Sequence, residues 1–152
     1  MQENTPFGVS ELLVQAQRMK KWYEEALHAV AVQYGLTMNE LSVLLFLANN
    51  PALNTARDIV QLRALAKSHV CMSVDALARR GLLAQQTDEK DKRRVRLFVT
   101  KAGQPAARAG QAAQQQTMEQ RLQGLEASNA RKLEEMRKTL AESMAALQAQ
   151  NA

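Results

Sequence analysis

The sequence is poor in residues that form covalent cross-links and metal sites: its 152 residues include one cysteine, two histidines and three prolines. Cys71 has no partner for an internal disulfide, and the histidines, forty-one positions apart, have no metal-ligand spacing. No apolar run approaches the roughly 20 residues that cross a bilayer, and residues 1–10 lack the basic and apolar parts of a secretory signal. We therefore expect a cytoplasmic protein with no metal and no other cofactor.

Signatures of catalysis are lacking as well. The sequence contains no glycine-rich phosphate loop, no nucleophile elbow and no cluster of metal ligands. Nucleophilic hydrolysis needs a base within hydrogen-bond reach of the nucleophile and a third group that orients this base. The sequence therefore predicts a protein that is not an enzyme.

Positive charge is concentrated in the middle of the chain. The net charge is +5, with eleven basic and five acidic residues between positions 55 and 101, against nine and ten in the remainder. Such a surplus is typical of a segment that meets a polyanion such as nucleic acid. Charge alone leaves a solvated basic face as the alternative.

Three helices are predicted in the first part of the chain. Apolar side chains at helical spacing predict a long amphipathic helix over residues 10–34. Thr37 with Glu40, and Thr55 with Asp58, form capping-box patterns that open two further helices. The first of these ends near Pro51, and the second is about two turns long.

A fourth helix is predicted over residues 67–80, with Val70, Val74 and Leu77 on its inner face. The residues expected on its outer face are small or able to form hydrogen bonds: Lys67, Ser68, His69, Met72, Ser73 and Ala76. A helix of this size fits the major groove of B-DNA, where its side chains reach base edges. A solvated helix face is the other interpretation of this pattern.

A β-hairpin with a charged tip follows. Strands are predicted over 82–87 and 95–100, the second with Val95, Leu97 and Val99 on one face. The loop between them is longer than a hairpin requires, and extra loop length is usually functional. Its basic side chains fit DNA phosphates, and Arg93 or Arg94 suits the narrow minor groove.

The last third of the sequence predicts two helices. Residues 101–125 are rich in alanine and glutamine, and Gly124 and Ser128 predict a break. After the break a narrow apolar seam, typical of a helix that pairs with other helices, contains Leu133, Met136, Leu140, Met144 and Leu147.

These elements in this order resemble the MarR family of bacterial winged-helix regulators, and the resemblance extends over nearly the whole chain. It is carried by Leu65-Ala66-Lys67-Ser68-His69-Val70, Val74-Asp75-Ala76-Leu77, Arg80-Gly81-Leu82-Leu83, Asp91-Lys92-Arg93, Leu97, Thr100 and Gly103. The fold expected is mainly α with a small β-hairpin wing (α+β), a winged helix-turn-helix whose N- and C-terminal helices form a dimerisation domain. Met72 and Ala66 depart from the family pattern, which often has a polar base-contacting residue and a helix-capping residue at these positions.

The resemblance implies a homodimer that binds a pseudo-palindromic operator as a repressor and is released by a small, aromatic-acid ligand. Residues 36–100 are expected to form the DNA-binding lobe, and residues 1–35 with 101–152 the dimerisation region. Asp91 is expected to brace the wing. The predicted dimer contacts are Leu12, Leu13, Leu133, Met136, Leu140, Met144 and Leu147. The predicted contacts to double-stranded DNA are Thr55, Arg57, Lys67, Ser68, His69, Met72, Ser73, Lys92, Arg93 and Arg94.

Other interpretations stay open at this point. The basic wing also suits a helical interaction protein that binds a protein or an anionic surface, or a DNA-binding protein without sequence preference. Met19, Trp22 and Tyr23 are candidates for an effector pocket, although aromatic residues at helical spacing are more often core or dimer interface. A redox role for Cys71 is a weaker hypothesis, because a lone cysteine on a helix is usually inert.

Overall fold

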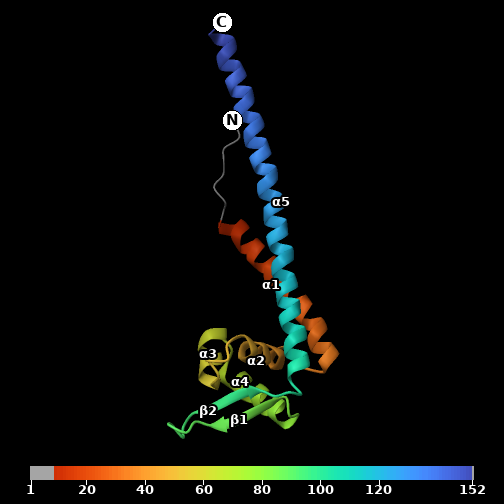
Figure 1. The fold of residues 1–152 in the computed structure, drawn as a ribbon, viewed down its shortest axis with the longest axis vertical. Helices are drawn as coiled ribbons and strands as arrows, with labels where there is room; N and C mark the ends of the chain where they lie inside the picture. Colours follow the sequence, from red (N-terminus) through yellow and green to blue (C-terminus); the bar gives the residue numbers. More distant parts are fainter. Residues whose placement is uncertain (1–8, 152) are drawn as a thin grey trace. The chain divides into compact units, whose positions relative to one another are not determined.

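The computed structural model describes residues 9–151, which form five helices and one two-stranded antiparallel sheet (Figure 1). The elements are α1 (Val9–Tyr34), α2 (Met38–Asn49), α3 (Ala56–Arg63), α4 (Lys67–Arg79), β1 (Leu83–Thr87), β2 (Val95–Val99) and α5 (Gln104–Gln150). This confirms the predicted fold class, a mainly helical winged helix with a β-hairpin wing.

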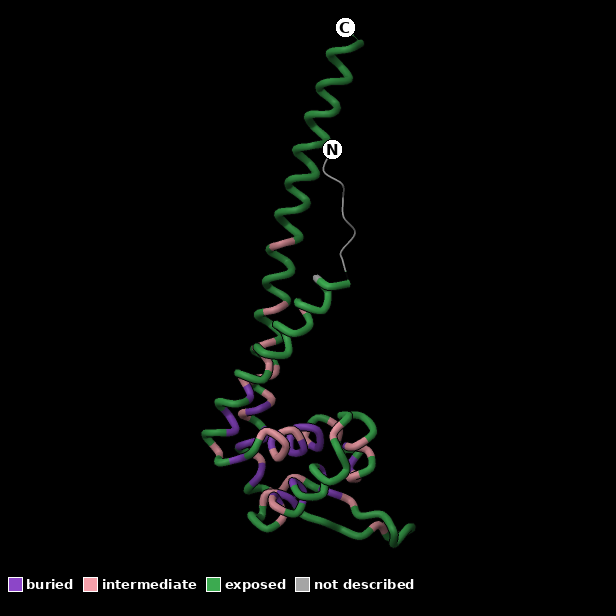
Figure 2. Tube along the Cα trace, turned by 180° about the vertical axis from the view of Figure 1, so that it is seen from behind, coloured by how far each residue is buried: buried purple, intermediate pink, exposed green. Residues whose placement is uncertain are grey.

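Contacts divide the chain into two units, residues 1–115 and 116–152. The core of the first unit surrounds α2, which is buried on nearly every side because six of its twelve residues are buried apolar side chains. The second half of α1, the inner face of α4 and the first turns of α5 supply most of the remaining core residues (Figure 2). In the second unit the side chains of α5 are almost all exposed.

Both predicted capping boxes are present. The Glu40 amide donates to the Thr37 hydroxyl at 3.1 Å, and the Glu40 carboxylate accepts from the Thr37 amide at 3.0 Å. Thr55 and Asp58 form the same reciprocal pair at the start of α3. These bonds satisfy amides that the first turn of a helix leaves without partners, so both helices begin where the sequence predicts.

The inner face of α4 is wider than predicted. Val70, Val74 and Leu77 are buried as expected, but Ser73 is also buried, at 5% exposed. The placement of Ser73 on the outer face is therefore wrong. Its spacing explains the burial, since Ser73 lies three residues after Val70 and four before Leu77, and such positions share one side of a helix.

The wing has the expected antiparallel pairing, with Leu83 opposite Val99 and Thr87 opposite Val95. Leu97 is buried and Val99 is partly buried, whereas Val95 is 42% exposed. All three lie on one face of β2, because side chains alternate along a strand. Val95 is exposed because its end of the hairpin extends toward the tip of the wing.

The predicted break near Gly124 and Ser128 is wrong, because α5 is one uninterrupted helix of 47 residues. A single glycine costs a helix only about 1 kcal/mol relative to alanine. The alanine, glutamine, glutamate, leucine and arginine residues that flank Gly124 are strong helix formers. One glycine is therefore too weak a signal to end this helix.

The wing passes into α5 through a tight junction. The Thr100 hydroxyl donates to the carbonyl of Gly81 and accepts from the Gly103 amide. A β-carbon at Gly103 would lie 2.3 Å from the Leu82 carbonyl oxygen. The chain backbones therefore approach here more closely than any residue with a side chain permits.

Within residues 9–151, no single helix has the length and hydropathy of a membrane span. The pair Leu12–Tyr34 and Met38–Asn49, bent by 99°, passes this test by length and composition. Most apolar residues of the second member are buried in the core.

Candidate nucleic-acid interface

The outer face of α4 is a line of exposed side chains. At about 100° per residue, the direction opposite the buried face contains Ser68, Met72, Asp75 and Arg79. Lys67 and His69 are also exposed, on either side of this line. Four of the five predicted DNA contacts on α4 are thus open to solvent, and Ser73 is not. We call Ser68, Met72, Asp75 and Arg79 the outer ridge.

Ala66 lies at the N-cap of α4 and makes no side-chain hydrogen bond there. Amides in the first turn of α4 therefore lack the side-chain partner that Thr37 and Thr55 give to α2 and α3. The first turn of α4 is exposed at Lys67, Ser68 and His69. Its amides add partial positive charge to the end of the helix that is expected to meet DNA.

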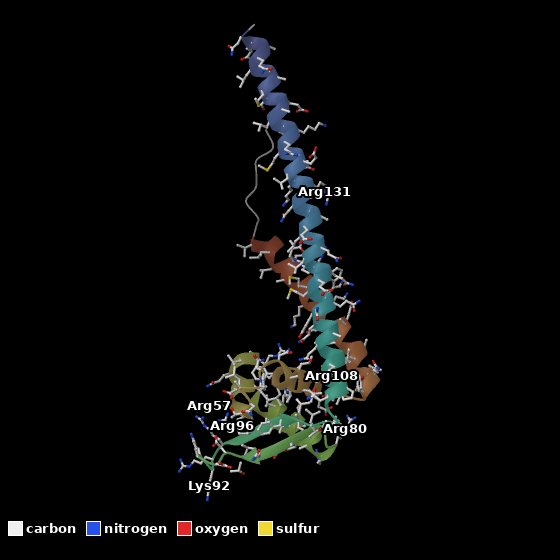
Figure 3. All side chains as sticks on the ribbon, viewed as in Figure 1. Arg57, Arg80, Lys92, Arg96, Arg108 and Arg131 are labelled. Carbon is white, nitrogen blue, oxygen red and sulfur yellow. The ribbon has the colours of Figure 1, made fainter. Side chains whose placement is uncertain are left out.

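The loop at the wing tip has four exposed basic side chains, Lys90, Lys92, Arg93 and Arg94. Figure 3 labels Lys92 at the end of the hairpin. Asp91 holds the turn beneath them, since its carboxylate accepts from the Arg93 amide at 3.1 Å and its carbonyl accepts from the Arg94 amide at 2.9 Å. The same carboxylate lies 3.8 Å from Nε of Arg94. Asp91 therefore shapes the turn at the wing tip.

A second set of contacts, which the sequence did not reveal, holds the base of the wing. Arg96 donates through Nε to Asp88 at 3.1 Å and through Nη1 to the Asn54 side chain at 2.8 Å. The Asn54 carbonyl also accepts from the Leu97 amide at 2.8 Å, and Asn54 is only 6% exposed. The hairpin brings Asp88 and Arg96 close together, but no local pattern in the sequence connects either residue to Asn54. These bonds fix β2 to the loop before α3.

The pKa of the Asp88 carboxyl is lowered from its ordinary value of about 3.8 by the hydrogen bond from the Lys90 amide and then by Arg96. Because folding depresses this pKa, the stabilisation of the wing is complete at neutral pH and is lost as pH falls below 3.8 through the folded-state value. An NMR titration of the Asp88 carboxyl carbon should therefore give a midpoint below 3.8, with the Arg96 side-chain signals following it.

The Asp88→Asn variant is the control, because it should remove the acid transition from the Arg96 signals. A carboxyl midpoint at or above the ordinary value would contradict the anchoring role of Asp88.

A groove of about 910 Å³ lies between the start of α3 and the wing. Its lining brings Arg57 of α3 together with Arg93, Arg94 and Arg96 of the wing. Arg57 and Arg96 are labelled in Figure 3. Thr55 also lines it, although its hydroxyl already donates to Asp58 at 2.6 Å within the capping box. The groove thus collects positive charge where two separate elements meet, an arrangement suited to a phosphate backbone.

The sequence model of the MarR family matches residues 34–94, from the end of α1 to the tip of the wing. Over these residues the chain is similar to the MarR family. The resemblance predicted from the sequence is thereby confirmed on α2, α3, α4 and the first strand of the hairpin. No curated protein sequence matches the chain.

Solved structures have a similar fold. A MarR family transcriptional regulator from Silicibacter pomeroyi has a TM-score of 0.65 at 18% identity, covering 80% of this chain and 82% of that one. The YusO protein of Bacillus subtilis has a TM-score of 0.55 at 20% identity, covering 88% and 94%. The S. aureus MepR–DNA complex has a TM-score of 0.53 at 22% identity, covering 88% and 95%. At sequence identities of 18%, 20% and 22%, the structural similarity shows a shared fold only.

A second groove, about 890 Å³, lies along α1 and the start of α2. Of the three predicted effector residues, Tyr23 lines this groove, whereas Met19 and Trp22 are exposed side chains outside its lining. The Tyr23 hydroxyl accepts from the Gln114 side chain at 2.6 Å. The remaining lining combines apolar side chains with both signs of charge: Lys20, Lys21, Glu24, Glu25, Leu27, His28, Met38, Asn39, Ser42, Arg63 and Leu65.

The apolar residues predicted to form the dimer are all exposed in this single chain. In the first unit these are Leu12 and Leu13, and in the second they are Leu133, Met136, Leu140, Met144 and Leu147. Met118, Leu122 and Leu125 are further exposed apolar residues of the second unit at matching spacing. Together they form the α5 seam, which repeats every eleven residues, for example at Leu122, Leu133 and Met144.

Proposed function

We propose that this protein is a sequence-specific DNA-binding transcription regulator that acts as a homodimer. The observation that carries the proposal is the combination, in one MarR-family lobe, of an exposed outer ridge on α4 with an arginine-lined groove that ends in the wing. A protein of similar fold, S. aureus MepR, has a solved structure in complex with DNA. This similarity supports DNA as the ligand of the present protein. Residues 36–100 form the proposed DNA-binding lobe.

Each part of the lobe has a distinct role in this proposal. The outer ridge of α4 enters the major groove, where donor and acceptor patterns distinguish all four base pairs. Arg57 and Arg94, which line the groove beside α3, contact phosphates and fix the register of the protein on the duplex. Arg93 enters the adjacent minor groove, where the negative potential is strongest.

The homodimer is supported by the exposed α5 seam. Burial of each large apolar side chain contributes about 1.5–3 kcal/mol of favourable free energy relative to its exposure to water. An eleven-residue repeat keeps a seam nearly straight along an α-helix, since 3.67 residues per turn is close to the helical period. A second copy of the chain has the same repeat, so the two α5 seams bury each other in the dimer. Residues 1–35 with 101–152 form the proposed dimerisation region.

Repression relieved by a small aromatic acid is the final part of the proposal. The groove beside Tyr23 offers apolar side chains for a ring and cationic side chains, among them Lys21 and Arg63, for a carboxylate. A ligand bound there contacts α1 as well as α2 and the segment before α4. Binding of a ligand in this groove therefore influences the orientation of α4 relative to α1, a helix of the proposed dimerisation region.

A gel shift with increasing salt tests the central claim. Duplexes selected from a random pool should bind more tightly than unselected ones, and log affinity should fall with log salt by about 0.9 per phosphate contact. Equal affinity for selected and random duplexes would leave a DNA-binding protein without sequence preference. Absence of DNA binding at low salt would leave an interaction protein.

Arg93→Ala is expected to weaken DNA binding by about 1–3 kcal/mol without loss of stability. The side chain is exposed at the wing tip and contributes nothing to the core. Arg131→Ala, which removes the same charge from an exposed position on α5, is the matched control and should bind nearly as the unmodified protein does (Figure 3). Equal affinities for the two variants would refute the assignment of the wing.

A further inference from the structure

Met72 is the one large apolar side chain of the outer ridge on α4, and it is 69% exposed. Its ridge neighbours are Ser68 one turn before it and Asp75 one turn after it. No core residue covers it, because the buried face of α4 points the opposite way. Met72 therefore presents an unbranched apolar chain in the middle of a polar surface.

The chemistry of the major groove limits what such a side chain can recognise. Guanine presents acceptors there, cytosine presents a donor, and adenine presents one of each. Thymine presents an acceptor and the C5-methyl group, the one apolar group among the four bases. The methionine side chain is flexible, and its thioether has no hydrogen-bond donor and is only a weak acceptor. Its most favourable contact with a base edge is therefore apolar packing on this methyl group.

Two other uses of Met72 fit the structure less well. A protein docking site needs a contiguous apolar patch of several hundred Å². Around Met72 the ridge instead offers a hydroxyl, a carboxylate and, at Arg79, a guanidinium. A packing role is excluded because the side chain is open to solvent.

We propose that Met72 packs on the C5-methyl of a thymine in each half-site and so makes this protein selective for thymine at the position facing the second turn of α4. The inference rests on the proposed function, since it requires α4 to lie in the major groove. It names a specificity-determining residue and the chemical group that this residue reads.

Substitution of uracil for thymine tests the proposal, because uracil lacks the methyl group and keeps the hydrogen-bonding edge. Duplexes selected by the unmodified protein are resynthesised with uracil at one thymine per half-site and measured in turn. One position should lose about fourfold in affinity per uracil, the equivalent of one buried methyl-sized group. At that position, Met72→Gln should bind the thymine and uracil duplexes equally.

Val32→Gln is the matched control, since Val32 is an exposed apolar residue on α1 in the same unit. This variant should keep the full uracil effect. Selected sites without a common thymine, no uracil effect at any position, or an undiminished effect in Met72→Gln would each overturn the role of Met72 while leaving DNA binding intact. Failure of the unmodified protein to bind any duplex would overturn the proposed function and this inference together.

Discussion

Replacing Leu140 and Leu147 together with glutamate is expected to separate the dimer and abolish operator binding at the same time. Both side chains are exposed in the single chain and lie on the α5 seam. Burial of a leucine contributes about 1.5–3 kcal/mol, and a symmetric dimer loses four of them, so association weakens by about 6 kcal/mol or more. Operator binding follows, because two half-sites about one helical turn apart require two lobes held in register.

Sedimentation and gel shift measured on the same samples test this coupling. The matched control is Ala127→Glu with Ala145→Glu, which adds the same charge to α5 outside the seam and should leave a dimer that binds DNA. Circular dichroism separates dissociation from loss of the helix. A monomer that binds the operator as tightly as the unmodified protein would show that the seam has no role in DNA binding.

Gly103→Ala is expected to destabilise the winged helix by about 3 kcal/mol, the upper end of the usual range for an added methyl group in a packed site. The new β-carbon would lie 2.3 Å from the Leu82 carbonyl oxygen and 3.1 Å from a methyl of Val99. Because the nearest atom belongs to the backbone, no side-chain rotation relieves the clash. The junction between β2 and α5 must shift, and with it the hydrogen bond from Thr100 to the Gly81 carbonyl.

Urea unfolding of Gly103→Ala measures the loss, and Gly124→Ala is the control with the opposite expected sign. A β-carbon at Gly124 meets no atom within 4 Å, and the residue lies inside α5. Alanine there should stabilise the helix by up to about 1 kcal/mol. Equal stability of Gly103→Ala and the unmodified protein would mean that the close approach at Leu82 does not exist in solution.

Helix starts were predictable from the sequence because a capping box is a local structure. The bonds of Thr37 with Glu40 and of Thr55 with Asp58 span three residues, so spacing alone reveals them. The polarity of Ser73 favours the outer face of α4, but its angular position beside Val70 and Leu77 buries it. The break near Gly124 was wrong because one weak signal stood against many strong helix formers.

The wing illustrates the limit of local reasoning in the site. The charged hairpin and its basic tip could be predicted from composition and spacing, whereas the role of Asp91 was implied only by the family resemblance. The anchor at its base could not, because Asn54 lies forty-two residues before Arg96 and reaches it through the folding of α3 and α4 between them. The groove that joins Arg57 to the wing arginines depends on the same fold.

The sequence alone determined the order of the elements up to the start of α5, the apolar positions Val70, Val74 and Leu77 of α4 and the place of positive charge, because helical period, capping and strand alternation act within a few residues. Only the tertiary structure decided that Asn54 holds the wing, that Ser73 is buried and that Gly103 has no room for a side chain. Each of these depends on which distant segments meet. That is fixed by packing of the whole core around α2, and no short stretch of sequence contains it.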